Sequence, residues 1–151
     1  MNNVGLQIVF RYIHIVSAIL AVGGLAFLTF SLLPALKNTD ESTRQAILPP
    51  IIKRFSGIVG LAILALFISG VFTWISLAKT YNAMGKLANA LIGTKVLLAL
   101  VLFALLWAEA SGFIKPKKPR TMIVAKLHMG LLIVLIASVL RCLRLAYMTN
   151  K

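Results

Sequence analysis

Long apolar runs separated by short polar segments dominate this chain. Four runs can be delimited, at about residues 6–36, 55–77, 91–113 and 121–147. Within the first, Ile15 to Leu36 is a stretch of 22 residues without a charge. As a helix it would reach about 33 Å, which is enough to cross the hydrocarbon of a bilayer. The pattern therefore predicts four membrane-spanning helices.

The polar segments between the runs are short. They are KNTDESTRQ (Lys37 to Gln45), KTYNAMGKLAN (Lys79 to Asn89) and KPKKPR (Lys115 to Arg120), and Pro49-Pro50 is expected to mark the start of the second helix. Connections of this length join antiparallel neighbours. We therefore expect an all-α fold, an integral membrane up-down-up-down four-helix bundle that forms a single domain over residues 1–151.

Composition agrees with a membrane protein. Hydrophobic residues make up 60% of the chain and charged residues 13%, against about half and a quarter in soluble domains. A net charge of +13 would suggest nucleic acid in a soluble protein. Here the basic residues flank apolar spans, so the expected partner is a lipid bilayer and not nucleic acid.

The distribution of basic residues predicts an orientation. In the expected topology both termini and the second connection lie on one side, the termini side, and the other two connections lie on the far side. The far side carries nine basic residues and the termini side six. The positive-inside rule then places the far side in the cytoplasm and both termini outside.

The ionisable residues of the spans fall into two layers. Glu109 lies about 21 Å beyond Lys95 along the third helix, and His128 about 20 Å before Arg141 along the fourth. The layer on the termini side holds Arg11, His14, Lys95, Arg141 and Arg144, and the layer on the far side holds Glu109, Lys126 and His128. Ionisable residues inside a span are candidates for function.

His14 has a structural and a functional interpretation. Its helix face continues through the small residues Ser17, Ala18, Ala21 and Gly24, which points it toward neighbouring helices. It is then either a polar residue hydrogen-bonded between helices or a ligand for a metal or haem. The two histidines cannot share one iron within a protomer, because they lie in opposite layers. A haem would need His14 with another ligand, or with the His14 of a second copy in a homodimer.

The other polar residues also have two interpretations. Glu109 and His128 are expected to form a pair across the third and fourth helices, either structural or acting as a proton relay. Arg11, Arg144 and Lys126, near helix ends, are expected to extend toward the headgroups. The sequence contains no glycine-rich phosphate loop, paired carboxylates, CxxC or HExxH, which argues against hydrolase or nucleotide chemistry and leaves an enzymatic role open.

The first span resembles the opening helix of the CopD-like membrane proteins. In RYIHIVSAILAVGGLAFLTFSLLPAL the similarity falls on Arg11, Tyr12, His14, Gly23, Gly24, Pro34 and Ala35. RFSGIVGLAILALFISGVF (Arg54 to Phe72) and GTKVLLALVLF (Gly93 to Phe103) look like the family's second and third helices. The layout is also similar to the HemJ-type protoporphyrinogen oxidases, whose first-helix histidine matches His14 and whose third-helix histidine would fall near Gly93.

The residues and these resemblances together leave three functional hypotheses, of which the third rests only on the near absence of residues outside the spans. The first is an inner-membrane protein that binds or transports copper at the periplasmic side, with His14 as the ligand and Arg11 and Lys95 as polar neighbours. The second is a b-type haem protein that transfers electrons or oxidises a porphyrin or quinone, in which Arg11, Lys95, Arg141 and Arg144 surround His14 and suit haem propionates. The third is an accessory subunit of a larger membrane complex.

Overall fold

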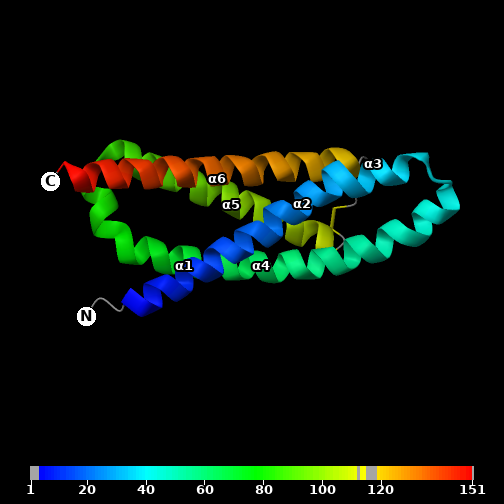
Figure 1. Ribbon diagram of the computed structural model, residues 1–151, viewed down its shortest axis with the longest axis horizontal. Helices are drawn as coiled ribbons and strands as arrows, with labels where there is room; N and C mark the ends of the chain where they lie inside the picture. The colour runs from blue at the N-terminus through cyan, green and yellow to red at the C-terminus, as the bar shows by residue number, and fades with distance from the viewer. Residues whose placement is uncertain (1–3, 112, 115–118, 151) are drawn as a thin grey trace.

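The protein is helical throughout the residues that the computed structural model describes, which are 4–111, 113–114 and 119–150. Helix accounts for 94% of them, and they contain no strand. Four helical segments among them are long and apolar enough to cross a membrane: Val4–Asn38, Glu41–Ala83, Lys86–Glu109 and Arg120–Thr149. Figure 1 shows that successive segments run back and forth along the long axis, with both termini at one end. The all-α prediction is confirmed.

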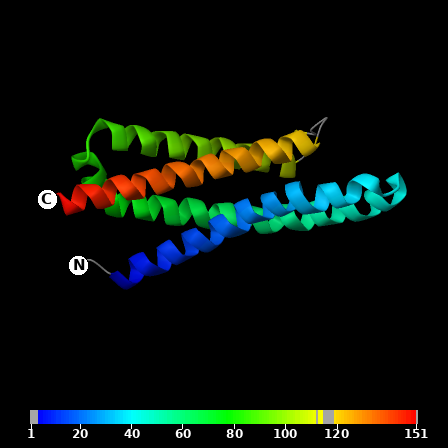
Figure 2. The ribbon, with the colours of Figure 1, turned by 45° about the horizontal axis from the view of Figure 1, so that its top comes forward.

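The four segments pack as two pairs. Figure 2 shows the first segment against α4 (Glu41–Ala83), and α5 (Lys86–Ala110) against α6 (Pro119–Thr149). The most extensive contacts join α1 (Val4–Ala18) to α4 and α5 to α6, whereas contacts of the first segment with α6 become substantial only after Ala18. As a result the N-terminal part of α1 diverges from α6 at the termini side (Figure 2).

The first segment is one long helical rod with two changes of hydrogen-bond register. After α1 it passes through a π-helical turn η1 (Ile19–Gly23), α2 (Gly24–Phe27), a second π-helical turn η2 (Leu28–Leu32), α3 (Leu33–Ala35) and a 3₁₀ turn η3 (Leu36–Asn38). Isolated π-helical turns inside α-helices often occur at functional sites. Here they keep the small face of the rod toward its neighbours, with Ser17 and Ala21 buried.

The core consists of small clusters between helices. Ala21 packs with Val59, Ala62 and Ile63 of α4. Leu25 and Leu28 pack with Ile123 and Leu127 of α6. Gly24 lets the Phe55 ring approach closely, because a Cβ added there would lie 2.8 Å from Cζ of Phe55. The expected small face of the first helix is therefore the face that contacts α4.

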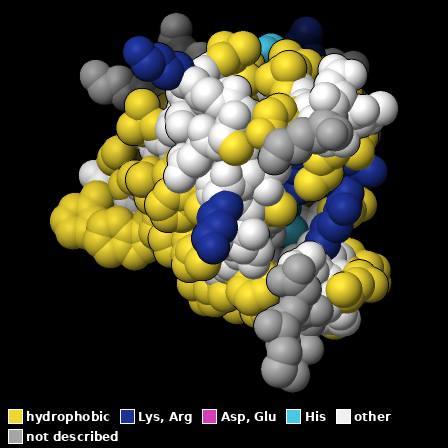
Figure 3. Space-filling view, turned by 90° about the vertical axis from the view of Figure 1, so that its left-hand side faces the viewer, with side chains coloured by type: hydrophobic (Ala, Val, Ile, Leu, Met, Phe, Trp, Pro, Cys, Tyr) yellow, Lys and Arg dark blue, Asp and Glu magenta, His cyan; other side chains and the backbone are white. Residues whose placement is uncertain are grey.

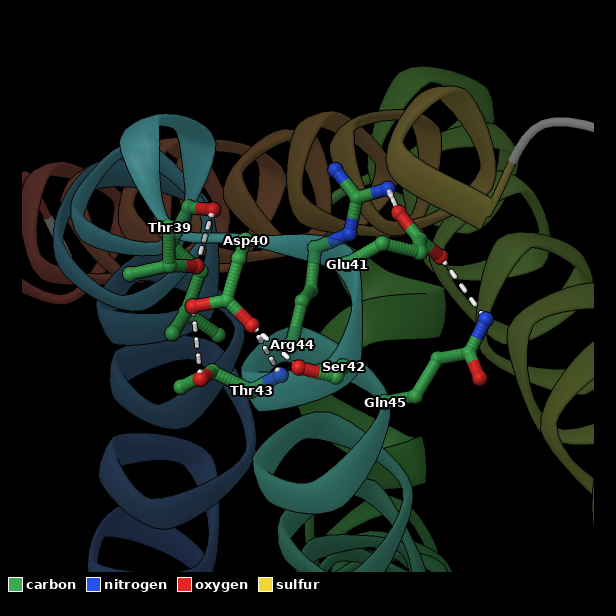
Figure 4. Close-up of polar contacts among 8 residues, drawn as sticks. Thr39, Asp40, Glu41, Ser42, Thr43, Arg44 and Gln45 are labelled. Atoms are coloured by element: carbon green, nitrogen blue, oxygen red, sulfur yellow. Dashed lines mark hydrogen bonds and ion pairs between the residues drawn. The ribbon is translucent and has the colours of Figure 1, made fainter.

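The start of α4 corrects the prediction made from Pro49-Pro50. Both prolines lie inside the helix, which begins at Glu41. Asp40 caps it by accepting hydrogen bonds from the Thr43 backbone N–H and the Thr43 hydroxyl, each at 2.8 Å (Figure 4). A good N-cap fixes a helix start, so much of the segment predicted as a polar connection is the first turn of α4.

The second connection is also shorter than predicted. α4 continues to Ala83 and α5 begins at Lys86, so that only Met84 and Gly85 join them. Gly85 has a φ of 92°, in the left-handed region that a glycine adopts without strain. The predicted turn over Lys115 to Arg120 falls largely on residues 115–118, which lie outside the described residues.

Candidate functional site

His14 lies against α4 and is fixed there by Ser69. Its Nδ1 is 2.8 Å from the Oγ of Ser69, whose side chain is almost completely buried. The Ser69 hydroxyl donates to the Ala65 carbonyl oxygen at 2.6 Å, so that its oxygen accepts from Nδ1–H of His14. Nε2 then carries the lone pair of the neutral ring and is the nitrogen available to a ligand. A histidine that binds a metal usually donates its other ring N–H in this way.

Two further contacts position the imidazole. Gly70 lies beside the ring, since a Cβ there would be 3.4 Å from Cε1 of His14. One turn before the histidine, Phe10 stacks on Phe72 of α4 with ring centroids 4.0 Å apart. Ser69 and Gly70 thus contact the ring of His14, and the stack of Phe10 on Phe72 joins α1 to the same stretch of α4.

The sequence did not single out Ser69. A serine that bonds back to the carbonyl four residues earlier is common in helices. Its hydrogen bond to His14 depends on where α1 crosses α4. In the sequence, Ser69 is visible only as a small polar residue next to Gly70.

Lys95 of α5 is close enough to His14 for a direct electrostatic interaction. It is partly buried, and it forms no ion pair with a described acidic side chain. The acidic residues of the chain are Asp40, Glu41 and Glu109, and the salt bridges of Glu41 and Glu109 are with other residues. Lys95 and His14 interact electrostatically across α1 and α5, and no described acidic side chain is paired with Lys95.

The other basic residues of the predicted layer differ in exposure. Arg11 and Arg141 are exposed. Arg144 is partly buried, and its Nε is buried without a hydrogen-bond partner among the described residues. Figure 3, which faces the termini side, shows a histidine recessed in a hollow between Lys or Arg side chains, with no acidic side chain visible on the described part of this face.

On the far side, the predicted pair of Glu109 with His128 is wrong. Glu109 forms a salt bridge with Lys126 of α6. His128 is exposed, and its Nδ1 is 2.8 Å from the Val124 carbonyl of its own helix. Lys126 and His128 belong to the same layer, and which of them faces α5 depends on how α6 is rotated about its axis.

The expectation that Lys126 extends to the headgroups is also wrong. Only 5% of the residue is exposed, and its ammonium is held between helices by the carboxylate of Glu109. The second carboxylate oxygen, Oε1, is buried without a hydrogen-bond partner in the described part of the chain. This pair is therefore a buried interhelical link.

The donor set bears on which group His14 could bind. The described residues contain no group of three or more His, Cys, Asp or Glu side chains that could hold a metal ion. Cys142 is exposed, and the nearest identified charge to His14 is that of a lysine. One imidazole beside uncompensated cations fits an anionic group that also needs a nitrogen ligand better than it fits a bare metal cation.

The described residues thus define an all-helical protein with four helices that are long and apolar enough to cross a membrane. No model of a protein family, no curated protein and no solved structure matches the chain. Function must therefore be argued from the arrangement of its own residues.

Proposed function

We propose that this chain is an integral membrane protein that binds b-type haem, with His14 as an axial ligand. The observation that carries the proposal is the imidazole of His14, which Ser69 anchors through Nδ1. Lys95 supports it, because it interacts electrostatically with His14 and forms no ion pair with a described acidic side chain. Haem combines an iron that takes imidazole with two carboxylates that take cations. It would supply one-electron redox chemistry at this position.

The membrane placement rests on the outer surface of the helices. Large apolar side chains are exposed along all four segments, for example Leu20, Leu61, Leu97 and Leu135. None of the most apolar window of α5 is buried. Contiguous apolar surface of this extent is rare on soluble monomers and is the normal exterior of a membrane helix. The far side in the cytoplasm and the termini in the periplasm remain our proposed orientation.

The residues of the site have separate roles in this proposal. Ser69 orients the ring of His14 and fixes Nε2 as the ligand atom. Lys95 binds a propionate, which is a counter-ion that no described acidic side chain supplies. A second ligand could come from another residue or from a second copy of the chain.

Absorption spectra of purified protein test this proposal. We expect a Soret band in protein purified in mild detergent or after adding hemin, and its loss in His14→Ala. His128→Ala is the matched control, because His128 is exposed on the far side, and it should keep the band. A preparation that keeps no hemin after unbound hemin is removed, or equal loss in both variants, would contradict haem binding.

Copper binding from the periplasmic side stays a second proposal, supported by the first-helix resemblance. Among the described residues it would rest on His14 alone. Metal analysis of the same preparations separates the two. Copper that is stoichiometric in the parent protein and absent from His14→Ala, without a Soret band, would favour copper. A protein that carries neither group and co-purifies with larger membrane proteins would favour an accessory subunit.

A further inference from the structure

A pocket of about 370 Å³ opens on the far side. The turn between α3 and α4, which borders it, lies at the end of the molecule opposite both termini (Figure 1). It lies where η3, α4 and α6 meet. Its lining combines apolar and basic side chains and contains no acidic one: Leu33, Leu36, Lys37, Arg44, Leu48, Ile52, Arg120 and Ile123. The volume is within the range of small-molecule sites.

The charges of this pocket are only partly balanced. Arg44 forms a salt bridge with Glu41 (Figure 4). Lys37 and Arg120 form no ion pair with a described acid. Two uncompensated cations therefore face a cavity whose remaining wall is leucine and isoleucine. An occupant needs a negative group at one end and an apolar chain at the other.

We infer that this pocket binds the headgroup and upper acyl chain of an anionic phospholipid. The inference rests on the membrane placement proposed above, because the pocket then lies at the level of the lipid headgroups. Basic pockets between membrane helices on the cytoplasmic side bind anionic headgroups. Lys37 and Arg120 contact the phosphate, while Leu36, Leu48 and Ile123 contact the chain. The site is separate from His14, which lies toward the other end of the molecule.

Native mass spectrometry of the full chain in detergent tests the inference. Phosphatidylglycerol and phosphatidylcholine with identical acyl chains are titrated into delipidated protein. We expect a first phosphatidylglycerol to bind at least tenfold more tightly than phosphatidylcholine. In Lys37→Gln/Arg120→Gln the affinity for phosphatidylglycerol should fall by roughly 30-fold, since each basic residue near an anionic headgroup contributes about fivefold. The preference over phosphatidylcholine should weaken accordingly.

Lys53→Gln/Arg54→Gln is the matched control. It removes the same charge from the exposed surface of α4 without touching the pocket lining, and it should bind phosphatidylglycerol like the parent. Equal binding of both lipids, equal loss in both double variants, or displacement of the lipid by millimolar inorganic phosphate would overturn the inference. His14→Ala should bind the lipid normally, so that failure of haem binding and failure of lipid binding are distinguished.

Discussion

His14 illustrates how a single side chain acquires a defined role from its surroundings. The sequence placed it at the start of an apolar span, on a face of small residues. The structure adds that Nδ1 faces Ser69 and that Lys95 is near. The hydrogen bond selects the ring nitrogen that is left for a ligand, and the lysine selects for an anion. Neither the serine nor the tautomer was predictable, because both depend on the crossing of α1 and α4.

Ser69→Ala should remove the hydrogen bond that orients the imidazole of His14 and leave the imidazole itself in place. Outer hydrogen bonds to a ligating histidine typically change metal affinity by about 10–100-fold. We expect hemin affinity to fall within this range, with a shifted Soret maximum and unchanged helical content by circular dichroism. Ser76→Ala is the control, because Ser76 also bonds back to a carbonyl of α4 but is exposed. Equal affinities for the two variants would refute the orienting role of Ser69.

Two adjacent glycines in the first helical segment differ in how closely a neighbouring side chain packs against them. Gly23 and Gly24 are adjacent, yet a Cβ at Gly23 would meet nothing within 4 Å while one at Gly24 would overlap the Phe55 ring. Overpacking of this kind destabilises by about 1–3 kcal/mol. We expect Gly24→Ala to lower the midpoint of thermal unfolding and Gly23→Ala to leave it unchanged or raise it. The reverse order would show that the contact of α2 with Phe55 is not tight.

At the scale of elements, the four helices were predictable and several of their ends were not. Apolar runs of this length are recognised by composition alone. Pro49-Pro50 indicates a later start for α4 than the structure has, whereas Asp40 followed by Thr43 is the capping pattern that fixes its first turn. The π-helical turns η1 and η2 were not predicted either, since they shift the apolar period by too little to be seen within a uniformly apolar run.

The cap of α4 should depend on pH. Hydrogen bonds from Ser42 and Thr43 lower the pKa of Asp40 from its ordinary value of 3.8. The stabilisation by its carboxylate is therefore complete above about pH 4 and is lost as the pH falls toward the lower pKa of the folded state. Asp40→Asn keeps a capping oxygen but does not titrate. We expect the difference in unfolding midpoint between the two proteins to be constant from about pH 8 to 5 and to change below about pH 4. A difference independent of pH would contradict this.

The link between α5 and α6 should behave as a buried ion pair. Removing one partner of such a pair costs about 3–5 kcal/mol, whereas replacing both is often neutral. We expect Glu109→Gln to lower stability strongly and Glu109→Gln/Lys126→Met to recover most of it. Glu41→Gln breaks the exposed pair with Arg44 and should change stability little. Denaturation in mixed micelles measures all three, and a double variant less stable than Glu109→Gln would contradict a paired role.

At the scale of the whole molecule, charge is distributed unevenly between the two ends. The three acidic residues are Asp40, Glu41 and Glu109, and the last two are paired with Arg44 and Lys126. Around His14 the basic side chains have no such partners among the described residues. The two-layer arrangement was predictable from helical rise alone. Which residues within a layer contact one another was not, because that depends on how each helix is rotated about its axis.

The central claim is that Nε2 of His14 ligates a haem iron, and chemical rescue tests it most directly. Hemin is titrated into the parent protein, His14→Gly and His128→Gly, with and without added imidazole. We predict a Soret band in the parent and in His128→Gly, its loss in His14→Gly, and its return in His14→Gly when imidazole fills the space left by the side chain. Hemin binding by His14→Gly that is as tight as in the parent, with or without imidazole, would contradict the claim.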